Sequence, residues 1–130
     1  MLALRTPLDL VHDLYAAFGR RDLAAIAALV SPDCAIRQTT ELPWGGHYHG
    51  HEGLREFFAR LTGAIDARFT PESVFAAGEQ VVAVGHTRGA ARASGRAFEI
   101  AAVHVWTVAD GRATRFEAYI DTPAMRAALG

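Results

Sequence analysis

The stretch VHVWTVADGRATRFEAYID, residues 103–121, decides the fold of this chain. Apolar and polar residues alternate on both sides of Asp110-Gly111, a dipeptide typical of a tight hairpin turn. The stretch therefore predicts two antiparallel strands joined at this turn. Because side chains alternate between the two faces of a strand, His104 and Trp106 share one face.

The length of the turn decides which residues of the two strands face each other. A three-residue loop places His104 opposite Phe116, and we favour this register over a two-residue loop, which places His104 opposite Glu117. In the favoured register one face carries His104, Trp106, Phe116, Ala118 and Ile120. The other face carries Arg115, Glu117, Tyr119 and Asp121. The first face is mostly apolar, so we expect it to face the interior and the second to meet water or another subunit.

The rest of the chain predicts helices first and further strands afterwards. Capping signals and apolar residues at helical spacing predict helices near residues 7–18, 23–30 and 53–61, and a short closing helix at 123–129. Alternating segments and turn residues predict further strands near residues 34–41, 47–50, 67–77, 80–91 and 96–108. Helices followed by a long antiparallel meander predict an α+β fold, with one domain over residues 1–130.

The composition is that of a globular protein with a sizeable core. Hydrophobic residues make up 51 % of the 130 residues, and 13 basic against 14 acidic side chains give a net charge of −1. No basic tract indicates a nucleic-acid partner. A single cysteine, Cys34, excludes an internal disulfide and suits a reducing compartment. The first residues, MLALRTP, do not resemble a signal peptide, and no stretch approaches transmembrane length, so we expect a cytoplasmic protein without a membrane partner.

His104 is the leading candidate for a functional residue, because the imidazole is the side chain that titrates near neutral pH. It is interpreted as an acid or base, as a hydrogen-bonding contact to a ligand, or as a satisfied core histidine. Trp106 is either a pocket wall or simple core. On the preceding strand His86 and Arg88 share a face, which either lies near a cavity, where the arginine could hold a carboxylate or enolate, or forms a solvated edge.

The loop before the third helix carries a second group of candidates. Trp44 lies in the sequence PWGG, and a tryptophan in a glycine-rich loop is expected to cover a pocket. His47 and His49 would share a face of a short strand, but no carboxylate or cysteine completes a recognisable ligand set, so we expect no metal site. The chain has no phosphate-binding glycine loop and no dinucleotide fingerprint.

Several motifs taken together resemble one known group of proteins. They are LYAAF (14–18), DL (22–23), PDC (32–34), GHEGLREFF (50–58), HVWTV (104–108), DGR (110–112) and RFEAYIDT (115–122). These motifs resemble the SnoaL-like and ketosteroid-isomerase-like branch of the nuclear transport factor 2-like superfamily, nearly end to end. The resemblance implies a cone-shaped, cystatin-like fold in which three N-terminal helices pack in a strongly curved mixed, largely antiparallel sheet. It also implies an open pocket, a homodimer through the outer sheet face, and neither a metal nor an organic cofactor.

The catalytic residues of such proteins transfer only in part. By resemblance to ketosteroid isomerases, the proton-abstracting aspartate falls at Gln38 and the oxyanion-donating aspartic acid near His104. By resemblance to polyketide cyclases of the SnoaL type, a histidine matches His104 and the base falls at Ala118. By resemblance to limonene epoxide hydrolases, an arginine and an aspartate fall near His86 and Arg88. The side chains of Gln38 and Ala118 cannot take up a proton, so neither residue can replace the carboxylate base of these enzymes.

We therefore expect a cofactor-independent isomerase, cyclase or lyase that acts by proton transfer on a small, mostly apolar carbonyl compound. The alternatives are a non-catalytic binding domain for a small hydrophobic metabolite and a purely structural dimerisation module. The expected catalytic residues are His104, His86 and Arg88. The residues expected to contact the ligand are Tyr15, Gln38, Thr40, Trp44, Trp106, Phe116 and Ala118. With histidine as the proton carrier, activity should follow a pKa near ~6.5, shifted by burial.

Overall fold

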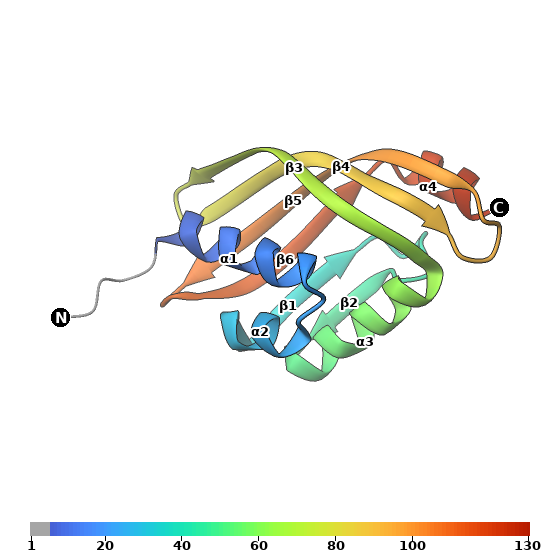
Figure 1. Cartoon of the computed structure of the whole chain (residues 1–130). Helices are drawn as coiled ribbons and strands as arrows, with labels where there is room; N and C mark the ends of the chain where they lie inside the picture. Colours follow the sequence, from blue (N-terminus) through green and yellow to red (C-terminus); the bar gives the residue numbers. More distant parts are fainter. Residues whose placement is uncertain (1–5) are drawn as a thin grey trace.

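The computed structural model describes residues 6–130 and confirms the α+β fold (Figure 1). The elements in chain order are α1 (Pro7–Gly19), α2 (Leu23–Leu29), β1 (Val30–Gln38), β2 (Gly46–His49), α3 (Gly50–Ala64), β3 (Ile65–Ala77), β4 (Gln80–Ala91), β5 (Ala97–Ala109), β6 (Arg112–Ile120) and α4 (Thr122–Leu129). The expectation about a signal peptide falls in part on residues 1–5, which lie outside the described residues. No helix within residues 6–130 is long and apolar enough to cross a membrane.

The strands of the described chain form one curved, six-stranded sheet in the order β2-β1-β6-β5-β4-β3. β1 and β6 run parallel, whereas the other neighbouring strands run antiparallel, so the sheet is mixed and largely antiparallel as predicted. Figure 1 shows α1, α2 and α3 on the same side of this sheet, with α4 near the C-terminus. The three N-terminal helices therefore cover the concave face, as the resemblance implied.

The local signals at the start of α1 explain why this helix forms where predicted. The Thr6 side chain accepts a hydrogen bond from the Asp9 backbone N–H at 3.1 Å, and Pro7 occupies the first helical position. The apolar face that the spacing predicted is buried against the sheet. The buried residues of α1 are Leu10, Val11, Leu14 and Ala17, of which Val11 and Leu14 belong to the predicted face.

β1 begins earlier than the sequence predicted. The sequence predicted a helix near residues 23–30 and a strand near residues 34–41, but the strand already starts at Val30, which pairs with Ala113 of β6. The ladder is irregular between Val30 and Ala35, and this irregularity accommodates a proline that cannot donate a backbone hydrogen bond.

The β5–β6 turn is shorter than predicted. Asp110 and Gly111 both have positive φ angles, 52° and 75°, and Ala109 pairs with Arg112. Positive φ at both central residues is the geometry of a two-residue hairpin turn. The favoured three-residue loop is therefore wrong.

A bulge after the turn also changes the partner of His104. The register shifts by one residue at Thr114, which has no partner on β5, and beyond it His104 pairs with Ala118. Both partners considered for His104, Phe116 and Glu117, are therefore wrong. The extra residue restores the alternation that the three-residue loop had assumed, so the predicted division of side chains between the two faces is correct.

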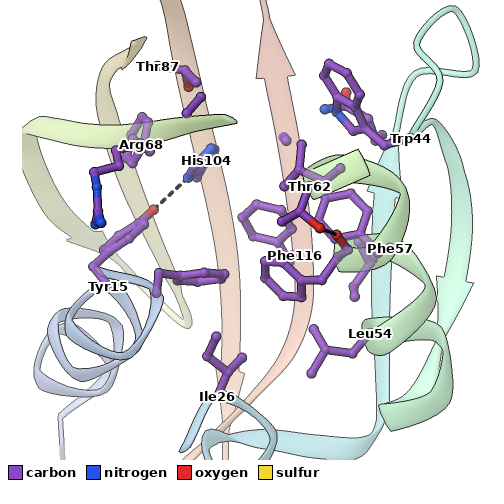
Figure 2. A pocket seen from close by; sticks show the side chains of 18 of the residues that line it. Tyr15, Ile26, Trp44, Leu54, Phe57, Thr62, Arg68, Thr87, His104 and Phe116 are labelled. Atoms are coloured by element: carbon purple, nitrogen blue, oxygen red, sulfur yellow. Dashed lines mark hydrogen bonds between the residues drawn. The ribbon is translucent and has the colours of Figure 1, made fainter. Parts of the chain in front are cut away.

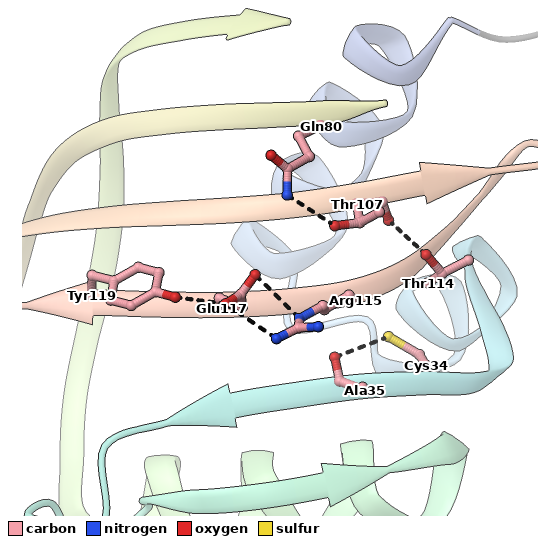
Figure 3. Close-up of polar contacts among 8 residues, drawn as sticks. All are labelled: Cys34, Ala35, Gln80, Thr107, Thr114, Arg115, Glu117 and Tyr119. Atoms are coloured by element: carbon pink, nitrogen blue, oxygen red, sulfur yellow. Dashed lines mark hydrogen bonds and ion pairs between the residues drawn. The ribbon is translucent and has the colours of Figure 1, made fainter. Parts of the chain in front are cut away.

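The outer face of the hairpin carries a row of polar side chains, shown in Figure 3. The Tyr119 hydroxyl donates to Glu117 Oε2 at 2.6 Å, and Arg115 Nε lies 3.2 Å from Glu117 Oε1. The Thr114 hydroxyl at the bulge donates to the Thr107 carbonyl at 3.3 Å. Tyr119 is 56 % exposed, so this face of the chain carries a large accessible aromatic ring.

Candidate functional site

A cavity of about 260 Å³ lies between the concave face of the sheet and the helices. Most of its wall is aromatic or aliphatic, as Figure 2 shows. The apolar lining residues include Phe18, Ile26, Leu54, Phe57, Phe58, Leu61, Phe69 and Met125. No aspartate or glutamate of the described residues lines the cavity. An apolar wall with a few polar groups is the usual construction of a small-molecule site.

Most of the residues predicted for the site line this cavity. They are Tyr15, Gln38, Trp44, His104, Trp106, Phe116 and Ala118. Trp44 belongs to the glycine-rich loop between β1 and β2 and is buried at the cavity wall. Thr40 lies in the same loop but is exposed and does not reach the cavity.

His86 and Arg88 are not placed near the cavity, and the expectation that they lie there is wrong. Thr87, between them on β4, lines the cavity, so alternation turns its two neighbours to the other face. There His86 contacts Glu72, and Arg88 forms an ion pair with Glu99 at 2.8 Å. The alternating sequence of β4 defined two faces but did not show which one points inward.

Tyr15 joins His104 and Trp106 in one hydrogen-bonded chain. The Trp106 indole N–H donates to the Tyr15 hydroxyl oxygen at 2.9 Å, and this hydroxyl lies 2.8 Å from His104 Nδ1 (Figure 2). Since an indole N–H can only donate, the phenol oxygen accepts there, and Nδ1 is then the one acceptor within residues 6–130 to which the phenol hydrogen can be donated. Nδ1 is then the acceptor nitrogen of a neutral imidazole, and Nε2 carries the hydrogen.

Burial keeps this imidazole neutral. Desolvation lowers the pKa of His104 from 6.5 to about 3. The ring lies 3.9 Å from the Phe69 ring and 5.0 Å from the Phe116 ring, measured between centroids, and no cavity carboxylate of the described residues compensates a positive charge. Burial also raises the pKa of Tyr15, so the phenol keeps its hydrogen. The expected shift by burial is therefore downward, and it favours the neutral imidazole of His104 at neutral pH.

Gln38 supplies a second polar group to the cavity wall. Its side chain is only 6 % exposed, and its Oε1 accepts the Thr39 backbone N–H at 3.0 Å. That contact fixes the orientation of the amide, because a backbone N–H needs an acceptor. The side-chain NH₂ has no hydrogen-bond partner within residues 6–130. Its nitrogen also keeps some accessible surface. It is therefore available to a molecule in the cavity.

Two arginines at the cavity lining were missed by the sequence reasoning. Arg21 Nη2 donates to the Ala67 carbonyl at 3.0 Å, and Arg68 Nη1 donates to the Gly19 carbonyl at 2.9 Å. The two bonds fasten the turn after α1 to the edge strand β3. The acceptors are backbone carbonyls far away in sequence, so no local pattern indicated these contacts.

The cysteine and the histidine pair of the loop take no special role in the geometry. Cys34 lines the cavity, and burial raises the pKa of its thiol to about 11, which keeps it protonated. His47 and His49 are exposed on β2. Among residues 6–130, no group of three or more histidine, cysteine, aspartate or glutamate side chains is arranged to hold a metal ion.

Comparison with known proteins finds similarity over nearly the whole chain. The model of the SnoaL-like domain matches residues 11–116. An NTF2-like protein from Burkholderia thailandensis is 33 % identical, with a TM-score of 0.91 over 98 % of this chain and 99 % of that chain. An NTF2-like protein from Burkholderia pseudomallei is 32 % identical, with a TM-score of 0.88 over 95 % and 96 %. TerC, co-crystallized with polyporic acid, is 29 % identical, with a TM-score of 0.87 over 95 % and 98 %. No curated protein matches the chain.

Proposed function

The chain belongs to the SnoaL-like family, and on this premise we propose that it binds a small, mostly apolar carbonyl compound in its cavity and polarises the carbonyl through His104. The observation that carries the proposal is the 2.8 Å contact between the Tyr15 hydroxyl and His104 Nδ1. It assigns the ring hydrogen to Nε2, the nitrogen left for a ligand. The similar TerC structure, co-crystallized with polyporic acid, supports an organic ligand for this chain.

A neutral donor in an apolar cavity suits carbonyl chemistry. When a proton leaves the carbon next to a carbonyl, negative charge develops on the oxygen, and a fixed N–H stabilises that charge strongly where water is excluded. His104 takes this role without changing its protonation state. The abstracted proton would leave to water or to a basic group of the substrate, since no carboxylate of the described residues lines the cavity. This division of roles is compatible with isomerase, cyclase or lyase chemistry.

The second candidate function is binding without turnover. The lack of an aspartate or glutamate in the lining within residues 6–130, together with the low pKa of His104, favours it. A binder needs a fitting cavity and a hydrogen bond, whereas proton transfer needs a base as well.

Calorimetric titration with two bicyclic probes tests the binding. 1-Tetralone carries one carbonyl oxygen, and tetralin has the same ring system without it. We expect tetralone to bind more tightly by about 3- to 10-fold, the value of one net hydrogen bond. In His104→Phe this preference should disappear. His86→Phe is the matched control, because His86 lies outside the cavity, and it should keep the preference. Equal binding of both probes by the wild type contradicts the proposal.

Deuterium exchange separates the two candidate functions. In D₂O a proton-transfer enzyme exchanges the hydrogens next to the tetralone carbonyl faster than buffer does, which proton NMR detects. Exchange that is lost in His104→Phe supports the enzyme, and binding without accelerated exchange supports the binding domain.

A further inference from the structure

We infer that Gln38 and His104 act as a pair of hydrogen-bond donors that selects ligands with two acceptor oxygens on opposite sides of an apolar ring, as in a cyclic diketone or quinone. The inference rests on the proposed function and adds to it the class of ligand and a second anchoring residue.

The sheet register places the two residues in one row. His104 of β5 pairs with Ala118 of β6, and Arg37 of the parallel strand β1 pairs with Glu117 of β6. One residue further along both parallel strands, Gln38 lies level with Ala118. The row across the concave face is therefore Gln38, Ala118 and His104, and all of them line the cavity.

Both ends of the row present a donor that no other residue within 6–130 uses. Gln38 Oε1 accepts from the Thr39 backbone N–H, which leaves the NH₂ group. His104 Nδ1 is the atom next to the Tyr15 hydroxyl, which leaves Nε2–H. A ligand with two carbonyl oxygens satisfies both ends.

The spacing fits acceptors on opposite sides of one ring. Neighbouring strands lie about 4.8 Å apart, so the backbones of Gln38 and His104, two strands apart, are separated by roughly 10 Å. Side chains on one face of a sheet project side by side, so the two donor nitrogens are separated on the same scale of roughly 10 Å. Oxygens on opposite sides of a six-membered ring are about 5 Å apart, and two hydrogen bonds of about 2.9 Å bring the span to about 11 Å, close to that separation. Between the donors the row carries only the methyl group of Ala118, and the Phe116 and Trp106 rings, 4.4 Å apart, belong to the same cavity wall.

Titration with a matched pair of probes tests the inference. One probe is 2,3-dimethyl-1,4-naphthoquinone, whose methyl groups hinder addition of the Cys34 thiol, and the other is 2,3-dimethyl-1-tetralone, with one carbonyl. The measured quantity is the ratio of their affinities. We expect the wild type to favour the dione by about 3- to 10-fold, as for one additional hydrogen bond.

Two variants of Gln38 and one control define the result. Gln38→Met removes the donor at similar size, and the ratio should fall to about 1. Gln38→Glu, titrated at about pH 9 so that the buried carboxyl is ionised, keeps an acceptor for the Thr39 N–H but replaces the donor by a carboxylate oxygen. The ratio should then fall to 1 or below even if the methionine variant does not fold. Thr40→Ala, outside the cavity, should keep the wild-type ratio.

The outcomes distinguish this inference from the proposed function. A wild-type ratio of about 1, or a ratio that survives in Gln38→Glu, overturns the donor pair while carbonyl binding through His104 stands. If 1-tetralone binds no better than tetralin, the proposed function fails and the donor pair fails with it.

Discussion

Acid should unfold this protein through His104, and replacing His104 by glutamine should remove that sensitivity. The folded pKa is lowered from 6.5 to about 3, so between these values the unfolded chain binds a proton that the folded chain does not. Stability from this group is therefore complete above pH 6.5 and is lost as the pH falls toward 3. Glutamine is close in size and does not titrate.

The magnitude follows from the pKa difference. Each pH unit below 6.5 costs about 1.4 kcal/mol, so at pH 4.5 the wild type should lose roughly 2–3 kcal/mol through His104 alone. That is a large part of a typical unfolding free energy of about 5–15 kcal/mol. The ring packs against Phe69, Phe116 and Tyr15, but His104 is only half-buried, so partial screening by solvent makes about 2–3 kcal/mol the upper end of the effect.

Urea unfolding followed by circular dichroism measures the effect at pH 7.5 and pH 4.5 in the wild type and in His104→Gln. Other groups titrate in both proteins, so the difference between the two proteins isolates His104. We expect the wild type to lose about 2–3 kcal/mol more than the variant between the two pH values. Equal losses would refute a neutral, desolvated His104.

Three further predictions concern the donor, the cavity and the outer face. Tyr15→Phe removes the partner of Nδ1, so ¹⁵N NMR of His104 should show a mixture of tautomers and the preference for tetralone over tetralin should shrink; an unchanged Nε2–H tautomer and preference argue against the positioning role of Tyr15. Ala118→Leu fills the space between the two donors, so calorimetry should show loss of tetralone binding with a melting temperature close to that of the wild type, and retained affinity would place the ligand elsewhere. We also propose a homodimer through the face that carries Arg115, Glu117 and Tyr119, because the exposed Tyr119 ring offers a contact surface; sedimentation should give the mass of two chains and of one chain for Tyr119→Asp, and a monomeric wild type would exclude this interface.

The fold was predictable because its signals are local. Thr6 and Pro7 start α1 as their residue types predict, and Asp110-Gly111 forms the turn of the last hairpin. The alternation around His104 also gave the correct inward face. Local chemistry and period are enough for such features, since they depend on residues only a few positions apart.

The corrections concern features that short sequence patterns did not show. The bulge at Thr114 changed the partner of His104, and no single residue there indicates a bulge. The choice of Thr87 rather than His86 as the inward residue of β4 depends on how the whole sheet packs on the helices. The low pKa of His104 depends on burial beside Phe69 of β3. The sequence alone did not show that β3 and β5 place these two rings in contact.

A crystal structure of the protein with 1-tetralone at pH 7 tests the central claim most directly. The account predicts the ketone inside the cavity, with its oxygen about 2.7–3.2 Å from His104 Nε2 and the Tyr15 hydroxyl still on Nδ1. A tetralone whose oxygen points away from His104, or a crystal at saturating tetralone with the cavity empty of it, would contradict the account.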